Sequence, residues 1–470
     1  MDILPRRAVL FMASFKGVLT REDKEKYEFV LLPFEVPEGV EAIEVEYSYR
    51  AAGSGECEVD IGLFSPGDPS FPADPSVFRG WSGTNKKRFV VGRRYATPGY
   101  LPGDITPGTW HILLGLYKIP ECGCEYEVRV ELLGSERGEE ARVPQPAGGG
   151  GGARGPGWFK GDLHVHSVHS DGDASVAELA RIASGKGLDF VVLTDHNTVS
   201  HVAECLSTAG PARVFPGMEV TTYYGHMNLF GVRSWVDFRA RSEGDARRVI
   251  EEAKRRGYFT SINHPKPDYP WLLGNEDRVD GLEVWQTVWE YFNYLSLRKY
   301  VELLERGRDV VAVGGSDAHR VAREEGIPRL GEPTTVVYME RLSEDEFLKS
   351  LRLGRVYVTE NPSGPRLVYR ARGGGAEASL ETSRLLPRVE SIEVFVEGGA
   401  GSVVLLLTPG GVVKLGFVDG DSSVVKASVE HSGDGFYALP LLASAEYPFD
   451  DPLSEDAVVR AIANPVLARR

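Results

Sequence analysis

Cysteine is scarce in this sequence, with four residues in a chain of 470. So few cysteines exclude a disulfide-stapled scaffold for a protein of this size. Cys122 and Cys124 are separated by one residue, which is shorter than the usual spacing of zinc-binding cysteine pairs. The sequence therefore favours buried free thiols, and it leaves open a bridge from Cys57 to one cysteine of that pair.

Long apolar runs are also absent, because none reaches the roughly 18–20 residues that a membrane helix needs. Residues 1–7 lack the basic-then-apolar order and the small-residue cleavage site of a secretory signal peptide. The sequence therefore predicts a protein with no membrane span and a cytoplasmic location.

Positive charge is in deficit, since 53 Lys and Arg stand against 68 Asp and Glu for a net charge of −15. Broad binding of DNA or RNA needs a basic surface, so this balance argues against a nucleic-acid partner and against a DNA-proofreading role. It remains compatible with a local basic pocket for one small anion. We therefore expect a small-molecule substrate.

The length predicts two to four domains, and a glycine-rich run at 146–157 marks the clearest boundary as a flexible linker. Residues 1–145 alternate short apolar runs with Gly/Pro turns. The period-two pattern at Val40–Tyr49 is typical of half-buried strands, so this part predicts a β-sandwich-like domain. The β pattern returns at 365–470, which predicts a smaller C-terminal β module.

Residues 158–364 change to strand–helix alternation, which predicts an α/β domain with a parallel sheet or barrel. Ser175 and Glu178 form a capping-box pattern before a helix that ends by Gly187. Phe190–Leu193 has the continuous apolar character of a buried strand. We expect further helices at about 246–256 and 293–306 and after Ser343, and further strands at 258–263 and 310–313.

Eight of the ten histidines lie between 164 and 319, mostly where predicted strands end. Their segments are 161–172, 194–197, 217–226, 262–265 and 315–319. The carboxyl ends of barrel strands meet at one rim, so these motifs are expected to converge, which scattered helix caps and core histidines would not do. Imidazoles and carboxylates without thiolates suit Zn, Mn or Fe. The number of candidate ligands predicts two or three divalent metal ions sharing a carboxylate.

The same motifs resemble those of the polymerase-and-histidinol-phosphatase (PHP) superfamily of metal-dependent hydrolases. The shared order is His-x-His with Ser-Asp-Gly, Thr-Asp-His, Glu, His-Pro and Ser-Asp-x-His, over about residues 158–365. The resemblance implies a distorted (β/α)7 barrel of PHP type with two or three metals at the carboxyl ends of its strands. It implies as metal ligands His164, His166, Asp171, His196, Glu219, His264, Asp317 and His319.

Glu219 is expected to be the bridging carboxylate, whereas His226 stays an open candidate ligand. His226 lies seven residues after Glu219, on the same strand or hairpin. An odd spacing would place the two side chains on opposite faces of a regular strand.

Five further residues are candidates for catalytic or supporting roles around the metals. His169 is a candidate proton donor, and Asp195 a candidate partner that orients a ligand imidazole, as is Asp162. Arg320 is a candidate positive charge for a substrate phosphate. Lys266 is another, although a solvated surface charge is the simpler interpretation of both Arg320 and Lys266.

The leading hypothesis is a phosphoesterase in which a hydroxide bridging two metals attacks a small anionic phosphate ester. Segments 326–335 and 354–359 resemble the subgroup around carbaryl hydrolase, which favours a carboxyl-ester, carbamate or amide hydrolase on the same metal centre. A non-enzymatic, metal-stabilised binding protein is the third hypothesis.

Two features would separate the first two hypotheses. Lys and Arg side chains gathered near the metals would favour the phosphoesterase. An apolar, aromatic pocket would favour the carboxyl-ester hydrolase. The aromatic candidates are Tyr223, Tyr224, Trp285 and Trp289.

Overall fold

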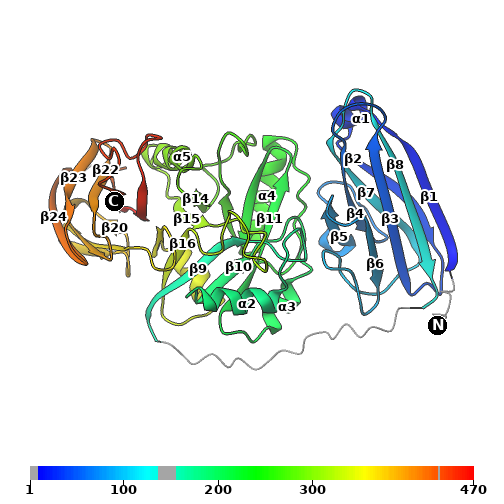
Figure 1. Ribbon diagram of the computed structural model, residues 1–470, viewed down its shortest axis with the longest axis horizontal. Helices are drawn as coiled ribbons and strands as arrows, with labels where there is room; N and C mark the ends of the chain where they lie inside the picture. Colours follow the sequence, from blue (N-terminus) through cyan, green and yellow to red (C-terminus); the bar gives the residue numbers. More distant parts are fainter. Residues whose placement is uncertain (1–8, 136–154, 432–434, 470) are drawn as a thin grey trace.

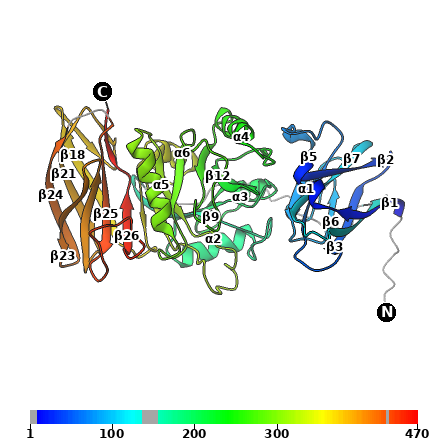
Figure 2. The same cartoon turned by 90° about the horizontal axis from the view of Figure 1, so that it is seen from above.

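The structure is a computed structural model, and it describes residues 9–135, 155–431 and 435–469. Three regions lie in a row along the long axis, with the N-terminal region at one end and the C-terminal region at the other (Figure 1). Figure 2 shows the same row from above. Residues 146–154 of the expected linker lie outside the described residues, and the last expected linker residue, Gly157, already begins a strand.

The N-terminal region, residues 9–135, consists of two antiparallel four-stranded sheets that share one apolar core. The strand orders are β1-β8-β3-β6 and β2-β7-β4-β5. The strand expected at Val40–Tyr49 is β3, displaced by two residues. The elements are β1 (Val9–Leu19), α1 (Arg21–Lys26), β2 (Phe29–Val36), β3 (Ala42–Ala51), β4 (Glu58–Phe64), η1 (Pro75–Val77), β5 (Phe78–Gly83), β6 (Arg88–Gly92), β7 (Gly108–Lys118) and β8 (Cys124–Leu133).

The cysteines of this region correct the sequence-based preference for free thiols. Cys57 and Cys124 form a disulfide, while Cys122 and Cys205 are free. Cys57 immediately precedes β4 and Cys124 begins β8, so the bridge joins the two sheets. The sequence could not choose between Cys122 and Cys124 because the choice depends on which of them faces the core.

The central region, residues 157–359, holds a curled, mixed sheet whose strands run in the order β15-β14-β13-β12-β11-β10-β9-β16-β17. Its elements are β9 (Gly157–Val165), α2 (Val176–Gly185), β10 (Phe190–Leu193), α3 (Val202–Ser207), β11 (Arg213–Thr222), β12 (Gly225–Phe230), α4 (Glu243–Arg255), β13 (Phe259–Ile262), β14 (Gly281–Gln286), α5 (Asn293–Glu305), β15 (Val311–Gly315), β16 (Thr334–Met339), α6 (Glu344–Arg352) and β17 (Val356–Thr359).

The predicted α/β class is confirmed, but a regular (β/α)7 alternation is not. Helices are fewer than strands in this region, since β11 and β12 form a hairpin and no helix joins β13 to β14. The pairs β9–β10, β10–β11, β13–β14 and β14–β15 are parallel, whereas the pairs made by β12 and β16 are antiparallel.

Serine caps begin the helices where the sequence predicts them. Ser175 accepts a hydrogen bond from the Glu178 amide, and the Glu178 side chain accepts one from the Ser175 amide, so α2 begins with a complete capping box. Ser343 caps α6 in a similar way, by accepting from the Glu346 amide.

The sheet curls until its last parallel strand returns to its first. Val165 at the end of β9 forms a bridge with Ala318, just after β15. The buried Asp162 carboxylate accepts hydrogen bonds from the amides of His164, Ser316 and Gly331 and so ties three segments together. The carboxyl ends of β9, β10 and β15 therefore face a common centre.

The C-terminal region, residues 366–468, continues the same sheet through β26, β25, β22 and β23 and covers it with a second sheet, β19-β18-β21-β24. Trp289 donates to the Ala457 carbonyl (2.7 Å), and β26 pairs with β17, so the chain end docks on the central region. The strands are β18 (Arg366–Gly373), β19 (Ala376–Ser379), β20 (Leu385–Leu386), β21 (Val389–Glu397), β22 (Ser402–Thr408), β23 (Gly411–Val418), β24 (Ser422–His431), β25 (Tyr437–Ser444), β26 (Val459–Ala463) and β27 (Val466–Ala468).

In the described part of the chain, none of the helices has the length and apolar character needed to cross a membrane.

Candidate metal centre

Carboxylates and imidazoles gather at the carboxyl ends of β9, β10, β13 and β15 and on the β11–β12 hairpin. Four overlapping groups of these side chains are arranged so that each can hold a metal ion. The groups are His166, Asp171, His196 and His319; His164, His264 and Glu283; His164, His166 and Asp317; and Glu219, His226 and His264. Every residue predicted as a metal ligand belongs to at least one group.

Glu219 lies at the middle of the site, on β11. Its carboxylate is almost fully buried and lies within 3.6 Å of ring nitrogens of five histidines. The shortest of these distances is 2.7 Å, between Oε2 and Nδ1 of His196. A carboxylate in this position can reach several groups of ligands at once.

The hairpin explains why His226 joins the site. Glu219 lies opposite Asn228, and Thr221 lies opposite His226, so the two residues are on the same face of the antiparallel pair. Nδ1 of His226 is 3.2 Å from Oε1 of Glu219. The odd spacing that argued against His226 applies only within one continuous strand.

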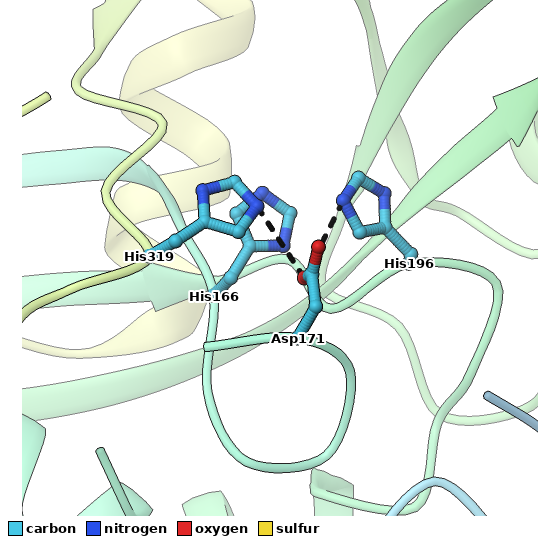
Figure 3. A group of neighbouring side chains, drawn as sticks. All are labelled: His166, Asp171, His196 and His319. Carbon is cyan, nitrogen blue, oxygen red and sulfur yellow. Dashed lines mark ion pairs between the residues drawn. The ribbon is translucent and has the colours of Figure 1, made fainter. Parts of the chain in front are cut away.

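Asp171 connects two of the site's histidines from the loop after β9. Its Oδ1 is 3.3 Å from Nε2 of His319 and 3.6 Å from Nε2 of His196. Figure 3 shows the carboxylate pointing between these two rings, with His166 beside His319. The rings of His166 and His319 are stacked at 4.1 Å.

Sequence reasoning missed Glu283, which is buried on β14. Its Oε1 is 3.0 Å from Nδ1 of His164, and its Oε2 accepts a hydrogen bond from the His264 amide (3.0 Å). An acidic residue in the middle of an apolar strand, Gly281–Gln286, was the available signal. Glu283 therefore has the geometry that orients a ligand imidazole, the role expected for Asp195 and Asp162.

The backbone at the site is held in unusual conformations. His264 and Asp317 have φ values of 26° and 63°, which non-glycine residues rarely adopt. Gly315 precedes Asp317 by two residues, and a Cβ there would lie 2.4 Å from Cβ of His164. Such strained and close-packed backbone is common at functional sites.

Mutual proximity shifts the pKa values of these groups in opposite directions. Burial alone would lower the pKa of His196, but the carboxylates of Glu219 and Asp171 raise it to about 10. Burial would raise the pKa of Glu219, but His196 and His164 hold it well below its usual range. Burial and the neighbouring His319 and His196 lower the pKa of His166 to about 4.

The residues present fit divalent cations. Among the described residues, several buried polar atoms of the site make no hydrogen bond: His164 Nε2, His166 Nδ1, Asp171 Oδ1, Glu219 Oε2 and His264 Nδ1. Buried polar atoms are nearly always paired, so a gathering of unpaired atoms in one place indicates a missing partner. Nitrogen and carboxylate ligands without thiolate suit Zn, Mn or Fe.

Asp195 lies beside the site but contacts backbone and hydroxyl groups rather than a ligand imidazole. It accepts hydrogen bonds from the amide and hydroxyl of Ser167 (2.8 and 2.7 Å) and from the hydroxyl of Ser170 (2.6 Å). These bonds fix the loop that carries Asp171.

The structure does not bring the His169 ring into any of the four groups. Its Nδ1 contacts Ser200 Oγ (2.8 Å) and its Nε2 contacts Glu204 Oε2 (3.1 Å). Arg320 is exposed and donates to the Asp171 carbonyl (3.1 Å). Arg320 therefore lies next to the site, whereas the two ring nitrogens of His169 are already engaged elsewhere.

Lys266 is buried, which corrects its interpretation as a solvated surface residue. Its Nζ donates to the side-chain oxygen of Gln286 (2.6 Å), and the Gln286 amide donates to Asp317 (3.2 Å). Burial lowers the pKa of Lys266 to about 7. The Lys266 side chain is therefore linked to the predicted ligand Asp317 through one intervening side chain, that of Gln286.

A cavity of about 550 Å³ opens onto Asp171, His196 and His226. Its other walls include Tyr223, Tyr224 and Tyr269, together with Asp60 and Tyr117 of the N-terminal region. None of the described residues that line it is Lys or Arg. Trp285 and Trp289, the other aromatic candidates, are buried and donate to backbone carbonyls instead. The volume is typical of a small-molecule site.

Comparison with known proteins agrees with this arrangement. The family model described as "PHP domain" matches residues 162–303. A curated relative, the DNA polymerase/3'-5' exonuclease PolX of Bacillus subtilis, is 43% identical over 51 residues, which cover 11% of this chain and 9% of the relative. The chain thus matches only about a tenth of that protein's length.

Two solved structures show a weaker likeness. A two-domain protein of Bacteroides vulgatus, described as PHP-like metal-dependent phosphoesterase, is 16% identical and covers 70% of this chain and all of its own, with a TM-score of 0.37. An amidohydrolase of Chromobacterium violaceum is 17% identical and covers 36% of this chain and 92% of its own, with a TM-score of 0.27. The resemblance to the carbaryl hydrolase subgroup stays a prediction. The matched family model and the motifs within it show that the chain contains a PHP domain at residues 162–303.

Proposed function

We propose that this chain is a metal-dependent phosphoesterase that acts on a small phosphate ester. The observation that carries the proposal is the overlap of four groups that could hold a metal ion around Glu219, with unpaired buried ligand atoms. Most of their residues lie within the matched PHP domain, and Asp317 and His319 follow it in the chain. Two or three divalent ions, Zn, Mn or Fe, would be held by the nine predicted ligands. Glu283 is added as the residue that orients His164.

Bound metals would activate water and stabilise the negative charge that develops on the attacked group. The chain's own residues supply the surroundings. Asp171, His196 and His226 face the cavity, so a substrate would approach the site from that side. Arg320 donates to the Asp171 carbonyl and would add positive charge near a phosphate. Lys266 is linked to Asp317 through Gln286 and would add positive charge when it is protonated. A barrel of the full PHP type, the domain division at 145, 157 and 364, and a cytoplasmic location belong to this proposal as predictions.

A second candidate function is hydrolysis of a carboxyl ester, carbamate or amide at the same site. It is favoured by the tyrosines that line the cavity and by the lack of Lys and Arg among its described lining residues. An uncharged carbonyl group needs no cationic side chain to bind, whereas a phosphate dianion relies on the metals and on residues outside that lining.

The test compares p-nitrophenol release from a phosphate monoester, a phosphate diester and a carboxyl ester by protein loaded with Mn²⁺ or Zn²⁺. His264→Ala is the blank, and His111→Ala, a histidine of β7 far along the chain from the ligands, is the matched control. Turnover of a phosphate ester that is lost only in His264→Ala supports the proposal. Turnover of the carboxyl ester alone favours the second function. Bound metal without any turnover favours the third hypothesis, a binding protein.

A further inference from the structure

The N-terminal region forms hydrogen bonds with three loops that lie next to predicted metal ligands. Asn85 and Lys86, between β5 and β6, both donate to the carbonyl of Ser170, next to Asp171 (2.8 Å from the Lys86 Nζ). Gly99 donates to the Ser200 hydroxyl (2.9 Å) and accepts from the Thr198 hydroxyl (2.8 Å), in the loop that follows His196. These contacts fix the distance between the region and the metal centre.

The third contact holds the turn of the β11–β12 hairpin. The Tyr223 hydroxyl donates to the Asp60 carboxylate (2.7 Å), and the Tyr223 ring stacks on Phe29 at 5.6 Å. A Cβ at Gly115 would lie 2.4 Å from the Tyr223 hydroxyl, so the two regions fit closely. This turn lies between Glu219 and His226 in the chain.

Apolar packing extends the same interface. Phe78 of β5 stacks on Trp235 at 4.1 Å, and Phe64 of β4 packs against the same indole. Residues of both regions share one core cluster. The N-terminal region is therefore a fixed wall of the cavity and not a loosely tethered neighbour.

The chemistry of this wall differs from that of the metal centre opposite. It presents the carboxylates of Asp60 and Glu58 and the ring of Tyr117, while Tyr269 stands 5.4 Å from the His264 ring on the other side. Lys118 pairs with Glu58 (3.1 Å). Asp60 accepts a hydrogen bond from the neutral Tyr223 hydroxyl, and the nearby charge of Lys87 only partly offsets the burial that raises the pKa of Asp60. Carboxylates repel an anion, and tyrosine rings offer faces for stacking.

We infer that the N-terminal region receives the leaving group of the substrate and selects a ring-containing group without negative charge, an inference that rests on the proposed phosphoesterase function. A phosphate at the metal ligands would place the alcohol portion of the ester in the rest of the cavity, between Tyr117 and Tyr269. Hydroxyl or amine groups on that ring can donate to Asp60. A negatively charged leaving group meets the same carboxylate.

The experiment uses two aryl phosphates of nearly equal shape, 4-carbamoylphenyl phosphate and 4-carboxyphenyl phosphate, with the Mn²⁺-loaded full chain at pH 8. Burial raises the pKa of Asp60 to about 6, so its carboxylate is charged in this assay. We expect kcat/KM for the carboxamide to exceed that for the carboxylate by about tenfold, the scale of one charge pair at several ångströms in a partly buried site.

Two matched variant pairs locate the effect. Asp60→Asn should lower that ratio several-fold, whereas Asp104→Asn, an exposed carboxylate paired with Arg93 outside the cavity, should leave it unchanged. Tyr117→Ala should raise KM for the carboxamide about fivefold, the scale of one aromatic contact. Tyr95→Ala is its control, because both tyrosines are 40% exposed but only Tyr117 lines the cavity.

Binding of the two free phenols, 4-hydroxybenzamide and 4-hydroxybenzoate, is measured by calorimetry as a readout that needs no turnover. Equal kcat/KM values for the two esters, with equal binding of the phenols, overturn the inference while the phosphoesterase stands. No turnover of either ester, with preferential binding of the amide, overturns the phosphoesterase and supports selection by the wall. A preference for the carboxamide in both turnover and phenol binding, lost in Asp60→Asn but kept in Asp104→Asn, supports the phosphoesterase function and the selection by the wall together.

Discussion

The Glu219 carboxylate faces more imidazoles than it can bond. Its two oxygens offer about four lone-pair positions, while five histidine rings lie within 3.6 Å. All five of those rings contact a second carboxylate of the site or one another. Cations placed between the groups would satisfy imidazole and carboxylate lone pairs together, which an arrangement of hydrogen bonds alone does not.

Glu219→Gln keeps the shape of the side chain but removes its charge. We expect metal affinity to fall by more than about 100-fold, because a central ligand is lost. Glu283→Gln should lose about 10- to 100-fold, since Glu283 acts through the orientation of His164. Metal content after dialysis, measured by mass spectrometry, checks both variants. If Glu219→Gln retained as much metal as Glu283→Gln, Glu219 would not be the central ligand of the site.

Metal binding should release protons. Without metal, His196 keeps its proton up to about pH 10, because Glu219 and Asp171 raise its pKa. A ligating imidazole must be neutral, so below that pH its proton has to leave, and affinity should rise up to about tenfold per pH unit for each proton displaced. His166, with a pKa lowered to about 4, is already neutral near pH 7 and releases none.

Calorimetry of Zn²⁺ binding in two buffers of different ionisation enthalpy counts the released protons. We expect at least about one proton near pH 7, and about one fewer in His196→Ala. An affinity that stays flat between about pH 6.5 and 8.5 would count against this account, since it would mean that the ligands are neutral before metal arrives.

At the scale of elements, the sequence predicted what depends on local pattern. The helix caps at Ser175 and Ser343 and the strand at Phe190–Leu193 lie where the patterns place them. The sequence left open whether Glu219 and His226 share one strand or a hairpin, because the turn at Tyr223 and Tyr224 lacks the Asn-Gly or Asp-Gly pair typical of a tight turn. For the same reason the face occupied by His226 stayed open.

Glu283 was missed, and the Cys57–Cys124 bridge was left open but not favoured, for a different reason. Both depend on pairing between elements far apart in the chain, namely β14 with β9 and β4 with β8. A single sequence gives the identity of each residue but not which distant residue it contacts in the fold. Most of the ligand motifs were easier to find because they stand at the ends of strands, although Glu219 lies within β11.

The loop after β9 can be tested through its glycine. A Cβ at Gly172 would lie 2.3 Å from the His166 carbonyl oxygen, so Gly172→Ala must displace the loop that carries Asp171. We expect a loss of metal content and a drop in stability of roughly 1–3 kcal/mol, as for other overpacked sites. Metal analysis and urea unfolding of the metal-free protein measure the two effects.

Gly185→Ala serves as the control for this loop. Gly185 lies in α2 with nothing within 4 Å of a built Cβ. The substitution should raise the free energy of unfolding by up to about 1 kcal/mol, since alanine favours the helix, and should leave metal content unchanged. Equal metal content in the two glycine variants would show that the loop tolerates displacement.

At the scale of the whole molecule, one core cluster contains residues of all three regions, and the central and C-terminal regions share a sheet. The sheet of the central region continues into the C-terminal region, and the candidate cavity lies between the central and N-terminal regions. The sequence pattern predicted separate regions, yet it gave no contact between them. The reason is that an interface is built from pairs such as Phe78 with Trp235, which are ordinary core residues when each is seen alone.

Asn464 joins the end of the chain to the central sheet by side-chain hydrogen bonds, and replacing it tests whether this end stabilises the fold. Its side chain is fully buried, accepts from the Ala312 amide (2.8 Å) and donates to the carbonyls of Ala312 and Val356 (2.9 and 3.0 Å). Asn464→Ala leaves several buried backbone groups unpaired, each worth about 1–3 kcal/mol, so we expect a loss of about 2–5 kcal/mol of unfolding free energy.

Asn361→Ala, which removes one exposed hydrogen bond to the Ser363 amide, should cost less than about 1 kcal/mol. If urea unfolding gives equal losses for the two variants, the chain end does not support the central sheet. If Asn464→Ala alone is destabilised and its metal content is retained, the C-terminal region acts on the stability of the fold and not on the ligands.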